Sequence, residues 1–373
     1  MNNDSMISNV EHLLGRIIDS QGEPIDGRGA ISSTARLPLY DVTTGEPKAQ
    51  GSAISLFETG IKVIDLLAPV PRGGIIAMRS MPGLGKLVVQ QEMLHNLTTH
   101  YDGYVVGIGM DESSYDASEL MVPFEALPDK QKMVLVFEQM SDSPQVLQRL
   151  VRAGLTLAIE LRGQGHETML VVDKNVVAKA DSSMLNALKR VTQEQGLLTL
   201  FLTPEEEGDV QHGAENDALK LLDTRIFFSR ELAKQNIWPA IDRIASSSRL
   251  LSRGDGLPRP DAVDDNLSSL SQEHIDVARQ VRELLQNYVS SSSDTGEDQQ
   301  MVRRAQRLQQ FLTQPFFVAE AFTDIPGEFV PFADTLRGCK ELLEGRYDDV
   351  HVEAFNFVGT IEQALMKAKV LGE

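Results

Sequence analysis

Residues 70–92 constrain the fold of this chain more than any other part of its sequence. Residues 75–78 form a short apolar run of the kind found in buried strands, and the residues from Leu87 onward show the apolar spacing of a helix. Residues 82–86 (PGLGK) lie between them and are here called the glycine loop. A strand, a tight glycine turn and a helix in this order are typical of loops that cradle phosphate groups.

The glycine loop keeps only part of the phosphate-binding consensus G-x-x-x-x-G-K-[ST]. In that consensus the glycines let backbone N–H groups turn inward, the lysine reaches the phosphates and the hydroxyl residue holds Mg²⁺. Here Ser80 replaces the first consensus glycine, and Leu87 replaces the hydroxyl residue, which argues against Mg²⁺. We expect a residual anion site formed by Gly83, Gly85 and Lys86. The alternative is that Lys86 is an exposed relic at the start of a helix.

Composition bounds the class of protein. A chain of 373 residues, of which 42% are hydrophobic, can bury the cores of more than one domain. No run of about 18 apolar residues occurs, and the N-terminal residues show no basic-then-apolar signal pattern, so we expect a soluble cytoplasmic protein without direct membrane insertion. Cys339 is the only cysteine, which excludes an internal disulfide and fits a reducing compartment.

The charge of the chain argues against nucleic-acid binding. Its formal net charge is −19, whereas surfaces that neutralise phosphate backbones are basic. The basic cluster of Arg303, Arg304 and Arg307 has helical spacing and is interpreted as a solvated helix face.

After the glycine loop, apolar runs of strand length alternate with helical patterns. Strands are expected at residues 104–108, 133–137, 169–172, 197–202 and 225–229, and helices at 146–161 and 182–195. Strands separated by helices form right-handed crossovers, so this pattern predicts a mainly parallel sheet covered on both faces.

The two ends of the chain follow other patterns. Near the N-terminus we expect a strand and turn at residues 14–24, an extended arm over 25–55 and a short helix within 57–69. Toward the C-terminus the predicted elements are all helices, at residues 272–288, 299–312, 335–344 and 360–371. The polar tract 290–298 between the first two is expected to be a turn or a disordered tip.

Several segments, in order along the chain, resemble the catalytic (beta) subunit of F-type rotary ATP synthases. The matching segments are LGRIIDSQGEPID (14–26), FETGIKVIDLLAPVPRGG (57–74), RAGLTLAIELR (152–162), IWPAID (237–242), SSSRLL (246–251), DVARQVRELLQNY (276–288) and RAQRLQQFLTQPFFVAEAFT (304–323). Their spread makes the resemblance far more specific than the incomplete glycine loop alone.

The resemblance implies an α/β fold: a RecA-like P-loop domain with a mainly parallel sheet, followed by an all-helical C-terminal domain. It divides the chain into an N-terminal remnant arm (1–52), a nucleotide-binding-type domain (53–253) and a helical domain (254–373). It also implies ATP or ADP as ligand and homologous alpha- or beta-like subunits as partners, in a family that couples ATP chemistry to proton transport.

The resemblance further implies several site residues. Asp173 matches the carboxylate associated with the metal, although an aspartate after a strand can equally cap the turn that follows. Trp238 matches an aromatic residue that stacks on the adenine base, and Phe316 and Phe322 match two other aromatic residues of that pocket. The alternative is that these three aromatic side chains belong to an interdomain core.

Other positions depart from the family pattern. Leu87, Met110, Asp111 and Val177 stand where the resemblance implies the metal-binding hydroxyl, the carboxylate that orients water and two arginines, in that order. A negative charge in place of an arginine should raise the barrier to phosphoryl transfer by several kcal/mol. The family's N-terminal barrel is also missing from the resemblance, and the tract at 290–298 is shortened, which puts ring assembly and torque transmission in doubt.

These departures lead to three hypotheses. The leading one is a catalytically inactive beta-like protein that senses nucleotide or acts as a regulatory or assembly subunit. The alternative is a divergent ATP-hydrolysing subunit of a rotary-type ATPase, which would use Glu112 as a shifted catalytic carboxylate together with Asp173. The third is a structural protein that binds no nucleotide.

Overall fold

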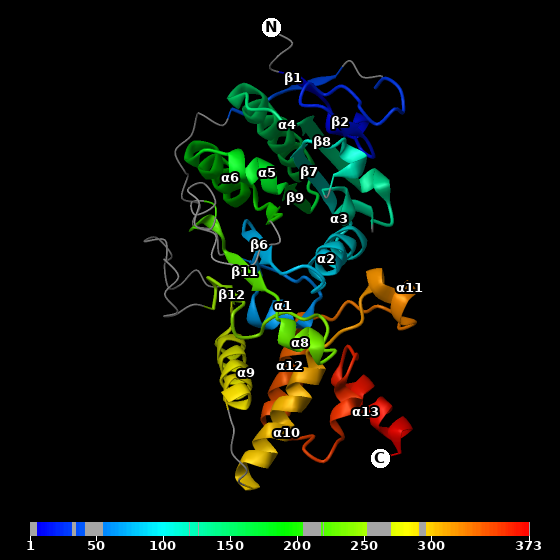
Figure 1. The fold of residues 1–373 in the computed structure, drawn as a ribbon, viewed down its shortest axis with the longest axis vertical. Coiled ribbons are helices and arrows are strands. Elements are labelled where there is room, and N and C mark those ends of the chain that lie inside the picture. Colours follow the sequence, from blue (N-terminus) through cyan, green and yellow to red (C-terminus); the bar gives the residue numbers. More distant parts are fainter. Residues whose placement is uncertain are drawn as a thin grey trace. The chain divides into compact units, whose positions relative to one another are not determined.

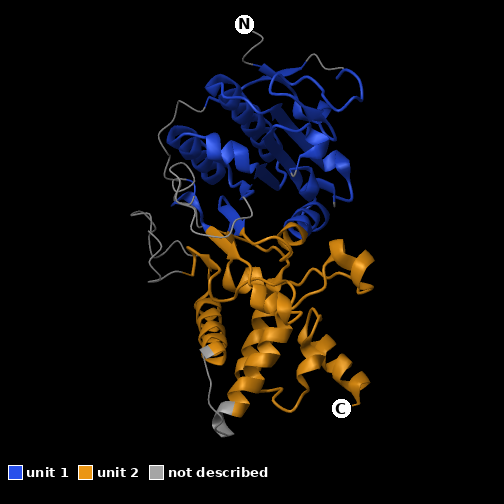
Figure 2. Cartoon of the chain, viewed as in Figure 1, with its two compact units in different colours: residues 1–52, 71–78, 90–223 blue, residues 53–70, 79–89, 224–373 orange. Residues whose placement is uncertain are grey.

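The computed structural model describes residues 6–31, 35–41, 55–118, 120–125, 127–203, 218, 220–251, 270–290 and 296–372. The chain forms two compact units (Figure 2). Unit 1 comprises residues 1–52, 71–78 and 90–223, and unit 2 comprises residues 53–70, 79–89 and 224–373. The domains predicted from the sequence, 1–52, 53–253 and 254–373, follow the order of the chain, whereas the compact units interleave along it.

Six strands of unit 1 lie in one sheet in the order β6-β10-β9-β7-β8-β2, and their pairings are parallel. The strands are β2 (Ile17–Ile18), β6 (Ile75–Arg79), β7 (Tyr104–Asp111), β8 (Met133–Gln139), β9 (Thr168–Val172) and β10 (Leu198–Phe201). Those in the middle are buried along almost their whole length, as their continuous apolar runs predict. The predicted parallel sheet is therefore confirmed.

Helices cover both faces of this sheet (Figure 1). They are α2 (Lys86–His100), α3 (Met121–Glu125), α4 (Pro144–Gly163), α5 (Lys174–Lys179) and α6 (Ser182–Gln195), with short 3₁₀ helices η2 (Val10–His12), η3 (Tyr115–Ala117) and η4 (Lys130–Lys132). A Cβ built on Gly107 would lie 2.8 Å from Phe124 of α3, and one built on Gly154 of α4 would lie 2.3 Å from Ile108. Because neighbouring strand residues point to opposite faces, α3 and α4 pack on opposite sides of β7.

The N-terminal part of unit 1 is more irregular than the sheet. β1 (Met6–Ser8) and β3 (Arg36–Pro38) form an antiparallel pair, and β2 adds a parallel edge strand beside β8. The strand predicted within 14–24 is only two residues long because the Asp19 carboxylate accepts the N–H groups of Gln21 and Glu23 and so begins the turn early. Most of the predicted arm, at residues 32–34 and 42–54, lies outside the described residues.

Unit 2 is mainly helical in its C-terminal part, which confirms the predicted helices. Its elements include β4 (Leu56–Phe57), α1 (Lys62–Leu67), β11 (Thr224–Phe227), α8 (Arg230–Lys234), β12 (Ser247–Ser248), α9 (Gln272–Ser290), α10 (Gly296–Phe311), η5 (Phe317–Ala319), α11 (Glu320–Thr323), α12 (Phe332–Leu343), η6 (Val352–Phe355) and α13 (Ile361–Leu371). β5 (Val70–Pro71) lies where the chain passes from this unit to the other. Residues 291–295 of the predicted polar tip lie outside the described residues.

Two arginines of α10 differ from their predicted role as a solvated helix face. Arg307 is only 4% exposed, and its Nε donates to the backbone oxygen of Val350 at 2.7 Å. Arg304 forms an ion pair with Asp348 and donates to the backbone oxygen of Leu343 at 3.1 Å. The prediction was wrong for these two residues because the segment after α12 folds back onto α10, which the helical spacing alone does not show.

Candidate functional site: the glycine loop and the carboxyl edge of the sheet

The glycine loop lies in unit 2, between the last residue of β6 and the start of α2. Gly83 and Gly85 have φ angles of +78° and +85°, in the left-handed region that glycine adopts without strain. α2 begins at Lys86, and the N–H of Val89 donates to the carbonyl oxygen of Gly85 at 3.1 Å. Lys86 is 6% exposed, so its side chain is not the exposed relic of the alternative interpretation.

Trp238 lies against this loop. A Cβ built on Gly85 would be 3.3 Å from Cζ3 and 3.7 Å from Cε3 of the indole, so the six-membered ring packs on the face of Gly85. Both residues belong to unit 2. The structure therefore brings together three residues that the sequence placed in one site, namely Gly85, its chain neighbour Lys86, and Trp238.

The two positions at which the sequence departs from the phosphate-binding consensus, Ser80 and Leu87, differ in their surroundings. The Ser80 hydroxyl donates to the backbone oxygen of Met81 at 2.7 Å and is buried. Leu87, at the position of the missing hydroxyl, is partly exposed. An alkyl side chain cannot coordinate Mg²⁺, which takes oxygen ligands.

Asp173 lies in unit 1, directly after β9. In the sheet, Val172 of β9 is opposite Phe201 of β10, which is opposite Ala77 of β6. The carboxyl ends of β9 and β6 therefore lie at the same edge of the sheet, and the chain continues from β6 into the glycine loop. This is the edge at which open parallel sheets bind their ligands.

The Asp173 carboxylate is 2% exposed, and its Oδ1 accepts the N–H of Asn175 at 2.8 Å. Burial raises its pKa to about 6, and the negative charge of Asp111 adds to the rise. The hydrogen bond is the capping interaction of the second interpretation, since Asp173 is the N-cap of α5. Its proposed role in metal binding stays a prediction.

Met110 and Asp111 end β7 at the same edge. The Met110 side chain is fully buried in the core of unit 1, and its backbone oxygen accepts the side-chain amide of Asn175 at 2.8 Å. The Asp111 carboxylate accepts the N–H of Ser113 and the hydroxyl of Ser118, each at 3.1 Å. The side chain at the position where the resemblance implies a catalytic carboxylate is therefore a core residue, and the following acid is held in a local turn.

The remaining predicted positions are Glu112, which follows β7, and Val177, in α5. Glu112 is exposed, and Val177 is 8% exposed within the hydrophobic core. Sequence reasoning missed Asn175, which holds Asp173 and Met110 together through its backbone and side chain. Asp173 itself was a signal for the first contact, because an aspartate after a strand can accept the N–H two residues on in an Asx turn, whereas the contact with Met110 has no local signal.

The other two predicted aromatic residues lie in unit 2 but differ in exposure. Phe316 is buried, whereas Phe322, in α11, is 88% exposed. The structure therefore does not enclose both side chains in one apolar pocket. Phe316 lies two residues after Gln314, whose backbone N–H donates to the carbonyl oxygen of Trp238 at 3.2 Å.

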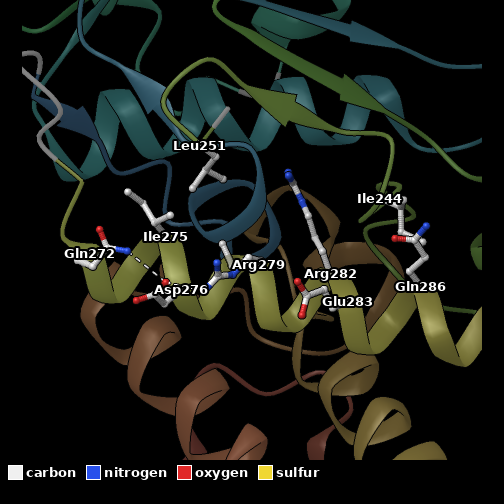
Figure 3. A pocket seen from close by; sticks show the side chains of 10 residues that line it. Ile244, Leu251, Gln272, Ile275, Asp276, Arg279, Arg282, Glu283 and Gln286 are labelled. Carbon is white, nitrogen blue, oxygen red and sulfur yellow. Dashed lines mark hydrogen bonds and ion pairs between the residues drawn. The ribbon is translucent and has the colours of Figure 1, made fainter. Parts of the chain in front are cut away.

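Two cavities lie apart from these predicted residues. One, of about 420 Å³ in unit 2, lies between α9 and residues 244–251, with Arg279 and Arg282 among its lining residues (Figure 3). Arg282 donates to the backbone oxygen of Ser246 at 2.9 Å, which fixes it to that segment. The other, of about 430 Å³ in unit 1, lies near the first residues of α4 and α6. Neither cavity contains a residue predicted from the sequence.

Among the residues that the structure describes, no group of three or more His, Cys, Asp or Glu side chains is arranged to hold a metal ion. Within the same residues, every helix is too short or too polar to cross a membrane.

Residues 60–197 match the family model described as the ATP synthase alpha/beta family, nucleotide-binding domain. The matched residues include the glycine loop and Asp173 but exclude Trp238, Phe316 and Phe322, and they make up well under half of the chain. The match supports the alpha/beta family, and with it a mixed, mostly parallel α/β domain built around a phosphate-binding loop. It does not distinguish the beta subunit from its relatives.

Proposed function

We propose that this chain is an ATP synthase beta-like protein that binds ATP or ADP without hydrolysing it, and that it acts as a nucleotide-sensing, regulatory or assembly subunit. Its partners would be homologous alpha- or beta-like subunits. The family match supports the nucleotide-binding part of this proposal, and the side chains at the carboxyl edge of the sheet support the inactive part.

One observation carries the proposal: Met110 is fully buried in the hydrophobic core at the position where the resemblance implies a water-orienting carboxylate. Hydrolysis of a phosphoanhydride depends on positioning and on electrostatic stabilisation of the transferred group. A thioether does not accept a proton from water, and Asp111 supplies a negative charge where a positive one would stabilise the transition state. These two residues therefore remove both contributions.

The glycine loop retains what binding alone requires. The backbone N–H groups at the start of α2 and the Lys86 ammonium would attract phosphate oxygens. The Trp238 ring, which packs beside Gly85, offers an aromatic face for an adenine base. Binding would thus use a phosphate contact and an aromatic contact within unit 2.

Mg²⁺ would add little to this binding. The hydroxyl that would coordinate the ion is replaced by Leu87. Burial and Asp111 raise the pKa of Asp173 to about 6, so protons compete with a metal ion for this carboxylate only at about pH 6 and below. We therefore expect the affinities for ATP and ADP to depend weakly on Mg²⁺.

Calorimetric titration with ADP and ATP, with and without Mg²⁺, tests the proposal. Binding that is indifferent to Mg²⁺ and lost in Lys86→Ala, together with no phosphate release from ATP, is the expected result. Lys340→Ala is the matched control, because it removes an exposed lysine of α12 that pairs with Glu273 and is not part of the loop.

Two outcomes would contradict the proposal. Mg²⁺-dependent binding with hydrolysis that is lost in Glu112→Gln would establish the divergent ATPase. If neither nucleotide binds to a sample that circular dichroism shows to be folded, the remaining hypothesis is a structural protein that binds no nucleotide.

A further inference from the structure

Gln314 has a buried side chain that joins two other segments of unit 2. It is 2% exposed and follows the end of α10. Its Oε1 accepts the backbone N–H of Lys62 at 2.9 Å, and its Nε2 donates to the backbone oxygens of Gly60 and Glu328, each at 2.6 Å. Both amide hydrogens are used, so the side chain holds the start of α1 and the segment before α12 in one place.

The backbone of the same residue extends this network to the glycine loop. The Gln314 N–H donates to the carbonyl oxygen of Trp238 at 3.2 Å. The indole of Trp238 in turn packs on Gly85. A continuous set of contacts therefore runs from the glycine loop through Trp238 to Gln314, and every residue in it belongs to unit 2.

On its other side Gln314 borders residues 316–328, here called the Phe322 segment. The ends of this segment are pinned together, because the Glu328 N–H donates to the Pro315 oxygen at 3.2 Å. A Cβ built on Gly327 would lie 2.2 Å from the backbone nitrogen of Phe317, so the backbone at the two ends of the segment is in contact. Between these ends, residues 320–326, including Phe322, are exposed.

We propose that Gln314 is a positioning residue that couples the glycine loop to the Phe322 segment through Trp238, so that occupancy of the loop is read out at Phe322. The claim that Gln314 positions Trp238 in the free protein depends on the contacts above alone. The claim that occupancy of the loop is read out at Phe322 rests on the proposed nucleotide binding.

The chemistry of the side chain explains why a glutamine is needed at this position. A methionine of similar length would remove the side-chain partners of the Lys62 N–H and the Glu328 oxygen, and unsatisfied buried groups are costly, whereas the Gly60 oxygen would still accept the N–H of Val330 at 3.1 Å. A glutamate would keep the acceptor for Lys62 but would place a second oxygen against the oxygens of Gly60 and Glu328. Both substitutions keep the backbone N–H that donates to Trp238, so we expect them to act by displacing the Gln314 backbone and, with it, Trp238 from its position on Gly85.

Trp238 is the only tryptophan of the chain, so its fluorescence reports on this contact directly. In the free protein, Gln314→Met and Gln314→Glu should each shift the emission to longer wavelength and increase acrylamide quenching by about twofold, as expected when a packed ring becomes exposed. Gln90→Met is the matched control. Gln90 is equally buried, and among the described residues neither polar atom of its side chain has a hydrogen-bond partner.

The second measurement follows chymotrypsin cleavage after the exposed Phe322, with the products identified by mass. ADP should slow this cleavage in the unmodified chain and in Gln90→Met, and should leave it unchanged in Gln314→Met. Calorimetry on each variant shows whether ADP is bound.

The outcomes separate the two proposals. If Gln314→Met and Gln314→Glu lower the unfolding midpoint but keep the emission and quenching of Gln90→Met, then Gln314 is only structural and the inference is overturned. Equal protection of Phe322 by ADP in all variants would also overturn it. If ADP binds to none of the proteins, the proposed function fails, while the fluorescence result in free protein still decides the role of Gln314.

Discussion

Three buried ionisable side chains are each held by neighbouring groups that offset part of the cost of burial. Asp65 accepts the N–H and hydroxyl of Thr59, at 2.8 and 2.7 Å, and yet burial raises its pKa to about 7. Lys62 donates to the backbone oxygen of Val358, and burial lowers its pKa to about 7. Asp173 resembles Asp65, because it also accepts a hydrogen bond while burial raises its pKa. Such groups make stability depend on pH in directions that can be stated in advance.

For Asp173, the pKa of about 6 in the folded chain is above its ordinary value of 3.8. The folded state then binds more protons than the unfolded state between these values, so stability falls as pH rises from about 4 to about 6. Asp173→Asn keeps an oxygen for the Asn175 N–H but removes the charge. We expect it to raise the free energy of unfolding at pH 7 by about 1–3 kcal/mol, and by much less at pH 4.

Urea unfolding at the two pH values checks this expectation, with the exposed Glu112→Gln as control. The contribution of Asp65 is common to both proteins and cancels in the difference. A decrease in stability at pH 7 would show that the ionised carboxylate stabilises the folded chain, which favours the capping interpretation and contradicts the expected effect of burial.

For Lys62 we expect the opposite dependence, in which stability rises with pH, in a higher pH range. Its pKa is lowered from 10.5 to about 7, so the unfolded state binds more protons between these values and stability rises with pH through this range. The side chain also lies 4.3 Å from the centre of the Phe311 ring. We expect the unmodified chain to gain about 2–4 kcal/mol relative to Lys62→Met between pH 7 and pH 10. A difference that does not change with pH would mean that Lys62 stays charged when buried.

The candidate site was only partly predictable at this scale. Gly83, Gly85 and Lys86 are adjacent in the sequence, so their consensus spacing was sufficient to find them. Asn175 and Gln314 were missed because their roles depend on backbone groups brought close by folding, such as the oxygen of Met110. The high exposure of Phe322 could not be deduced either, because an apolar pattern does not show which side chain a loop turns outward.

Among the elements, those with long uniform patterns were predicted best. The helix expected at residues 182–195 is α6, with the same bounds, since Asp181 caps its start and Gly196 its end in the left-handed conformation. Predicted strands were located correctly but were shorter or longer by a few residues, because strand ends are set by pairing with distant strands. The interleaved boundaries of the two units have no local signal at all.

The close approach of α4 to β7 gives a prediction for a whole element. Gly154 faces Ile108 so closely that an added Cβ would lie 2.3 Å from its Cγ1, whereas a Cβ on Gly163 of the same helix meets nothing within 4 Å. Gly154→Ala should therefore push α4 away from the sheet and lower the free energy of unfolding by about 1–3 kcal/mol. Gly163→Ala is the matched control and should change it by less than about 1 kcal/mol.

Denaturant unfolding of the two variants measures this difference. Equal stability of both would show that Ile108 moves aside at little cost, and that packing between α4 and β7 is looser than the distances indicate.

At the scale of the whole molecule, the departures from the family pattern are distributed over both compact units. Leu87 lies in unit 2, whereas Met110, Asp111 and Val177 lie in unit 1. Met110 and Val177 are part of one hydrophobic core, so their side chains now contribute to stability. Two of the positions at which the resemblance implies catalytic groups are thus core positions, and introducing the implied residues there would have to displace that core.

The burial of Met110 leads to a prediction for Met110→Glu, which introduces the carboxylate that the resemblance implies at this position. Met110→Glu would place a carboxylate among fully buried apolar side chains, where an uncompensated charge costs about 3 kcal/mol or more. We expect the variant to lose stability by that amount and to release no phosphate from ATP, because Asp111 still opposes charge development on the transferred group. Met110→Leu, which keeps the volume and polarity, should cost less than about 1.5 kcal/mol. Phosphate release by Met110→Glu above the level of the unmodified chain would show that this one residue, and not the combined pattern, limits hydrolysis.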